Sequence, residues 1–70
     1  LEWLRDQRGV TERQLEVAEL ALRGTTQPLI ARELGISRET VKRHIRSLLG
    51  RAGVRNVREL GALAQMMHVH

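Results

Sequence analysis

Apolar residues along the chain recur at intervals of three and four, the spacing that places them on one face of an α-helix. Glycines or short polar segments divide this pattern into four stretches. The stretches are predicted to be helices from residue 11 to about 23, over 27–34, over 37–51, and from 57 to about 67. No stretch alternates between apolar and polar residues as a half-buried strand does. The sequence therefore predicts an all-α fold, a compact four-helix domain.

Polar residues that favour helix starts precede three of the predicted helices. Thr11, with Gln14 three residues later, fits a capping box, and Ser37 and Asn56 are N-cap residues of the third and fourth helices. Pro28 is tolerated in the first turn of the second helix. Glycines at positions 24, 35 and 53 follow the first three helices and favour their ends. The helix boundaries thus have local causes.

Only Gly35 and Ile36 separate the second helix from the Ser37 cap of the third. So short a connection forces a sharp corner, a helix-turn-helix over residues 27–46. Ala31 supplies the small residue where the helices cross, and Gly35 can adopt the positive φ that the corner needs. Helical hairpins that do not bind DNA also use glycine corners, so the corner alone leaves both possibilities open.

The third helix separates apolar from basic residues. Taking Val41 as the reference and winding about 100° per residue, Ile45 and Leu48 fall within about 40° of it. Lys42, Arg46 and Arg43 fall at about 100°, 140° and 200°, on the opposite side. A basic amphipathic helix can also lie on an anionic membrane, but a helix wedged into a compact corner favours DNA.

Charge is concentrated in the middle of this 70-residue chain, whose net charge is +4. Residues 32–58 carry eight Lys and Arg against two Glu, whereas residues 1–31 carry four Arg against five acids. With one Trp and no Phe or Tyr, stacking of single-stranded bases on aromatic rings is poorly supported. The basic segment coincides with the helix-turn-helix, which favours double-stranded DNA as its partner.

The sequence from residue 10 to about 64 resembles the LuxR/FixJ-type helix-turn-helix family of bacterial transcription regulators. Family members show Leu-Thr-x-Arg-Glu, then Ile-Ala, Leu-Gly-Ile-Ser and Thr-Val-Lys-x-His, and finally Lys-Leu-Gly-Val. The matching segments here are 10–14, 30–31, 34–37, 40–44 and 51–54. Gln14 replaces an acid, Pro28 and Leu29 replace a polar pair, and Ala52 replaces a leucine.

The resemblance implies a recognition helix over 37–51 in the major groove, with Lys42, Arg43 and Arg46 as base contacts. Arginine can bond guanine with two parallel hydrogen bonds, and lysine can do so less rigidly. Five residues are expected to contact DNA phosphates, because they lie at the starts of the second and third helices or beyond the groove. They are Gln27, Ser37, Arg38, Thr40 and Arg51. Glu39 could accept from a cytosine amine, but a pair with Arg43 is favoured.

The fourth helix carries the apolar residues Leu60, Leu63, Ala64 and Met67. The resemblance implies that this helix joins two copies in a homodimer on DNA. The other expected partners are double-stranded DNA itself and RNA polymerase. If instead all four side chains pack on the first helix, no pairing surface remains.

The segment over 1–9 is predicted to be a linker or the tail of an upstream element, and the DNA-binding domain spans 10–70. Because the chain begins with Leu1, it is taken as a fragment, the output domain of a response regulator or LuxR-type regulator without its sensory or receiver domain. The location is predicted to be cytoplasmic, and no membrane or small-molecule partner is expected.

Catalytic chemistry has no visible basis in the sequence, because neither a Ser/His/Asp set nor paired carboxylates can be recognised. His68 and His70 have no neighbouring Cys, so no metal and no cofactor are predicted. Two other functions compete with the main hypothesis: a sigma-factor-like promoter-recognition module, against which residues 40–44 argue, and a helix-mediated protein-interaction or dimerisation module without DNA binding.

Overall fold

The structure, a computed structural model, describes residues 2–6 and 9–68. Within those residues it contains five helices and no strand. The helices are α1 (Glu2–Arg5), α2 (Glu12–Leu22), α3 (Gln27–Leu34), α4 (Arg38–Ala52) and α5 (Val57–His68). Helices α2 to α5 correspond to the four predicted helices. The all-α fold with its helix-turn-helix is therefore confirmed.

The predicted caps bring the helices to their observed boundaries. Thr11 Oγ1 accepts a hydrogen bond from the Gln14 backbone N–H at 3.1 Å, and Gln14 Oε1 accepts one from the Thr11 N–H at 3.2 Å. Asn56 Oδ1 accepts from the Glu59 N–H at 2.8 Å and caps α5 in the same way. Each bond satisfies a backbone donor that has no partner within its helix.

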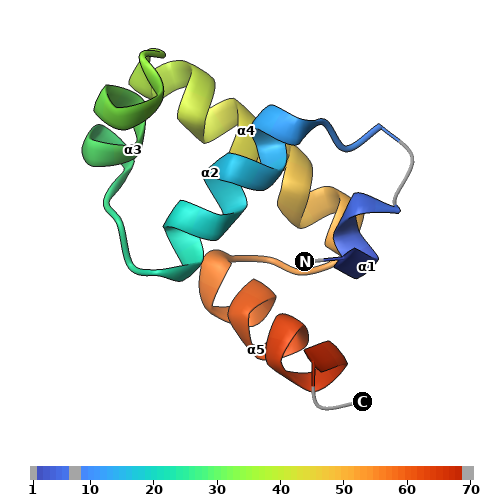
Figure 1. Cartoon of the computed structure of the whole chain (residues 1–70). Helices are drawn as coiled ribbons and strands as arrows, with labels where there is room; N and C mark the ends of the chain where they lie inside the picture. Colours follow the sequence, from blue (N-terminus) through green and yellow to red (C-terminus); the bar gives the residue numbers. More distant parts are fainter. Residues whose placement is uncertain (1, 7–8, 69–70) are drawn as a thin grey trace.

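Helices α2 and α4 pack against each other in the centre of the molecule, with α3 and α5 at opposite ends (Figure 1). Helix α3 contacts both α2 and α4, and so does α5. The short helix α1 contacts α2. Helix α4 therefore has one side supported by its neighbours along its length, which leaves its other side to solvent.

One cluster of buried side chains lies beneath the helix-turn-helix and fixes the angle between α3 and α4. It is formed by Val17, Ile30, Ala31, Val41 and Ile45, whose exposed fractions range from 0 to 8%. Burying a valine or isoleucine side chain stabilises a fold by roughly 1.5–3 kcal/mol. Three helices share these contacts, so the corner cannot open without exposing the core.

A second cluster includes a residue from the segment over 1–9. Leu4 in α1 is completely buried and packs with Leu15, Ala18 and Leu48, while Trp3 and Ala52 lie partly buried beside them. The sequence predicts a linker or the tail of an upstream element for this segment. The structure shows a short helix there, α1, which completes the core of the domain. Four residues are too few for a periodic pattern to reveal such a helix.

Helix α5 packs on the domain through its first turns. Leu60 is only 2% exposed, and a Cβ added at Gly61 would lie 3.5 Å from Leu22 Cδ2, so α5 approaches α2 closely there. Further along, Met66 and Met67 are 66% and 47% exposed. The end of α5 is thus the more accessible part of this helix.

Candidate nucleic-acid interface

The corner between α3 and α4 has the backbone conformation that its sequence predicted. Gly35 ends α3 in the left-handed region, with φ 67° and ψ 35°, which glycine adopts without steric strain. The next N–H, that of Ile36, donates to the Ala31 carbonyl at 3.0 Å. Ile36 packs partly buried against the core below the corner. The turn is therefore closed by hydrogen bonds and by an apolar seal.

Two hydroxyl groups organise the first turn of α4. Ser37 Oγ accepts from the Thr40 backbone N–H at 3.1 Å and lies 2.8 Å from Thr40 Oγ1. One hydroxyl hydrogen is used between these two side chains, so the other stays available for an outside acceptor. Both residues were predicted as phosphate contacts, and the pair can offer one hydroxyl donor to a phosphate oxygen.

The two faces of α4 differ as its sequence predicted. Val41, Ile45 and Leu48 are 0%, 8% and 1% exposed and face the core. The three predicted base contacts lie exposed on the other side of the helix: Lys42, Arg43 and Arg46. His44 is half-buried at the border between the faces. The structure thus brings the three cations together on one outward surface.

The predicted ion pair between Glu39 and Arg43 is not the one observed. Glu39 Oε1 instead lies 3.9 Å from Lys42 Nζ, in an i,i+3 pair whose side chains are 81% and 55% exposed. Residues three and four positions apart are both neighbours on a helix surface, so spacing alone did not decide between the two partners. The pair is solvated and contributes at most about 1 kcal/mol to stability.

The predicted phosphate contacts fall into two groups. Gln27, half-buried, and Arg38, exposed, lie at the starts of α3 and α4, the helices that meet at the corner. Arg51 lies near the other end of α4, where its guanidinium group rests against Gly9 so closely that a Cβ there would collide with it. The structure therefore does not bring Arg51 together with the residues at the corner.

A hydrogen bond between α2 and α4 escaped prediction. Gln14 Nε2 donates to Ser47 Oγ at 3.3 Å, although the same side chain also completes the capping box of α2. The capping pattern explained Gln14 locally, and no local signal points to a partner on another helix. The amide can serve both contacts because its oxygen accepts while its nitrogen donates.

The residues predicted for dimerisation differ in their accessibility. Leu60 is buried within the domain and has little surface left to present, Leu63 and Ala64 are half-buried, and Met67 is 47% exposed. The exposed Met66 extends the apolar surface at the end of α5. Any contact between two copies through α5 would therefore be made by residues in the second half of this helix.

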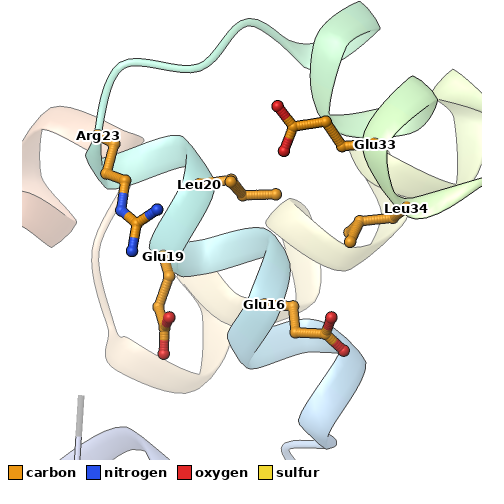
Figure 2. Close-up of a pocket in the computed structure, with 6 residues that line it drawn as sticks. All are labelled: Glu16, Glu19, Leu20, Arg23, Glu33 and Leu34. Carbon is orange, nitrogen blue, oxygen red and sulfur yellow. The ribbon is translucent and has the colours of Figure 1, made fainter.

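A shallow depression of opposite charge lies between α2 and α3. Figure 2 shows Leu20 and Leu34 between the two helices, with acidic side chains from both of them around the rim. The lining residues are Glu16, Glu19, Leu20, Arg23, Glu33 and Leu34. No residue of α4 lines it. The depression is thus separate from the cationic surface of α4.

Among residues 2–6 and 9–68, no three His, Asp or Glu side chains lie together in a way that could hold a metal ion. His70 and the side chain of His68 lie outside the described residues. In the described part of the chain, no helix is long and apolar enough to cross a membrane.

Comparison with known families agrees with this geometry. Residues 9–64 match the family model for bacterial regulatory proteins of the luxR family (GerE). The chain belongs to the luxR family. No curated protein and no solved structure matches the chain significantly. The luxR-family match covers α2, α3, the corner, all of α4 and the first two thirds of α5, and it identifies a DNA-binding helix-turn-helix domain of transcription regulators.

Proposed function

We propose that this luxR-family domain binds double-stranded DNA in a sequence-specific manner, with the recognition helix over 37–51 in the major groove. The observation that carries the proposal is the division of α4 into a buried apolar face and an exposed face with Lys42, Arg43 and Arg46. Arginine and lysine donate to the O6 and N7 atoms of guanine, which the major groove exposes. These three residues are the proposed base contacts.

Phosphate contacts on either side of the groove would fix the register of the domain on DNA. The proposed set at the corner is Gln27, Ser37, Arg38 and Thr40. The free hydroxyl hydrogen of the Ser37–Thr40 pair supplies one donor, and Arg38 supplies a charge. Arg51, which rests against Gly9, would contact the backbone separately, from the other end of α4.

The regulatory setting is part of the same proposal. The domain would be the output domain of a response regulator or LuxR-type regulator, acting in the cytoplasm with RNA polymerase as a further partner. It would bind DNA as a homodimer through α5, where Leu63, Ala64 and Met67 keep accessible surface and Leu60 supports them from the core. Two half-sites about one helical turn apart would then be occupied together.

Salt dependence tests the proposed DNA binding. Each phosphate that the protein neutralises adds about −0.9 to the slope of log K against log salt. With several basic residues engaged, we expect a steep decline in the affinity for duplex DNA, measured by fluorescence anisotropy. The Arg46→Ala variant should lose roughly 1–3 kcal/mol of binding free energy on the best site and relax the base preference there.

Binding that is weak and independent of salt would contradict this function. It would favour the second candidate, a protein-interaction module that acts through α5. The exposed Met66 and Met67 on that helix are the observation behind this alternative.

A further inference from the structure

The exposed face of α4 contains one acidic residue as well as its cations. Glu39, Lys42, Arg43 and Arg46 follow the spacing i, i+3, i+4, i+7, which places all four on one stripe of the helix. Glu39 is the only acid of α4, and its side chain is 81% exposed. Any DNA that contacts the cations of this stripe therefore also meets a carboxylate.

A carboxylate at this place has a distinctive effect on DNA binding. It is repelled by the phosphates, which lowers the affinity for every sequence. An ionised carboxylate only accepts hydrogen bonds. In the major groove, cytosine offers the N4 amine as a donor, adenine offers the N6 amine beside its N7 acceptor, and guanine and thymine present acceptors. The interaction energy of the carboxylate with DNA therefore depends strongly on which base the carboxylate faces.

The partner of Glu39 completes a pattern of one acceptor beside one donor. Lys42 Nζ lies 3.9 Å from Glu39 Oε1, and a lysine ammonium group only donates hydrogen bonds. A C·G base pair presents the reverse pattern, the N4 amine of cytosine beside the O6 and N7 acceptors of guanine. The ion pair is thus complementary to the edge of one C·G pair, whereas in an A·T pair the N6 amine lies between two acceptors, adenine N7 and thymine O4.

We infer that Glu39 is a specificity-determining residue, and that together with Lys42 it selects a C·G base pair in the recognised site. This inference rests on the proposed function, because it requires α4 to lie in the major groove. Glu39 accepts from cytosine N4, and Lys42 donates to the paired guanine. Opposite guanine or thymine the carboxylate faces acceptors, and opposite adenine the N7 acceptor adjoins the N6 donor, so these bases accommodate the carboxylate less well than cytosine does.

Selection from a library of random duplexes tests the inference. The starting protein should select a site in which one position is C·G, and competition with singly substituted duplexes should give a preference of at least about tenfold at that position. In Glu39→Ala this preference should fall to less than about twofold, while the other positions keep theirs. The affinity of this variant for random duplex should rise, because a repelled charge is gone.

Glu39→Gln gives a sharper expectation. A glutamine amide both donates and accepts, and it matches the N6 and N7 atoms of adenine. The preferred pair at the same position should therefore change from C·G to A·T. Glu19→Gln is the matched control, because Glu19 is exposed on α2 and lines the depression away from α4. It should select the same site as the starting protein.

The outcomes separate this inference from the proposed function. If the starting protein selects a consensus and both Glu39 variants select the same one, Glu39 is merely a helix-terminal charge and the inference is wrong. If no protein selects any consensus, the proposed sequence-specific binding fails as well. Thermal melting of each variant identifies any loss that comes from unfolding; Glu39 is exposed, and we expect little change.

Discussion

Ser37 controls the start of the recognition helix through one oxygen atom. Its Oγ accepts from the Thr40 N–H and contacts the Thr40 hydroxyl, so the first turn of α4 is tied to the corner at two points. Thr26 occupies the equivalent N-cap position of α3 but makes no side-chain hydrogen bond there. The two caps have the same kind of side chain and different contacts, which makes them a natural pair for comparison.

Replacing Ser37 by Ala should lower the free energy of unfolding by about 1 kcal/mol, because the Thr40 N–H loses its acceptor. The corresponding Thr26→Ala substitution should have a smaller effect, since no cap bond is lost. Urea denaturation followed by circular dichroism measures both values. Equal losses in the two variants would mean that the observed cap bond does not stabilise the start of α4.

Residues whose surroundings are set by their own helix could be predicted from the sequence. The outward direction of Lys42, Arg43 and Arg46 follows from helical periodicity once Val41 is placed in the core. The position of Arg51 against Gly9 could not be predicted, because it depends on how a distant segment folds back onto α4. Roles in DNA contact remain predictions for all of these residues.

Among the elements, α1 contributes more to stability than its length suggests. Four residues cannot form a stable helix by themselves, so α1 owes its structure to the burial of Leu4 against α2 and α4. Ala52, which stands where the family pattern has a leucine, lies partly buried beside the same cluster. The boundaries of α3 and α4 could be predicted from caps and glycines, whereas α1 depends on tertiary packing alone.

Leu4→Ala should destabilise the domain by about 2 kcal/mol, because it removes a completely buried side chain. The short α1 can shift to fill part of the space, which keeps the loss at the low end of the usual range for such substitutions. Met66→Ala serves as the control, since Met66 is 66% exposed and should change stability by less than about 0.5 kcal/mol. Calorimetric melting compares the two; a Leu4 variant that melts like the Met66 variant would show that α1 does not stabilise the core.

At the scale of the whole molecule, its cationic, acidic and apolar surfaces lie on different elements. The cationic stripe is on α4, the acidic depression lies between α2 and α3, and the accessible apolar residues are at the end of α5. Pairing through α5 would therefore leave the cationic stripe of each copy free for DNA. Such an arrangement is what binding to two half-sites requires.

Ala64→Glu should abolish cooperative filling of a duplex with two half-sites, because it places a charge in the apolar surface of α5. Affinity for a single half-site should stay nearly the same, which also verifies that the variant is folded. Gln65→Glu is the matched control, since Gln65 is exposed on the side of the same helix away from Leu63 and Met67. Electrophoretic mobility shift titrations measure both affinities, and unchanged cooperativity in the Ala64 variant would exclude α5 as the pairing surface.

The burial of Leu4 means that the unit defined by family resemblance and the unit that folds have different N-terminal limits. The family match begins at residue 9, but a chain shortened to that point would leave Leu15, Ala18 and Leu48 uncovered on one side. Three apolar side chains exposed together favour self-association. Domain boundaries taken from family alignment alone would thus divide this protein inside its own hydrophobic core.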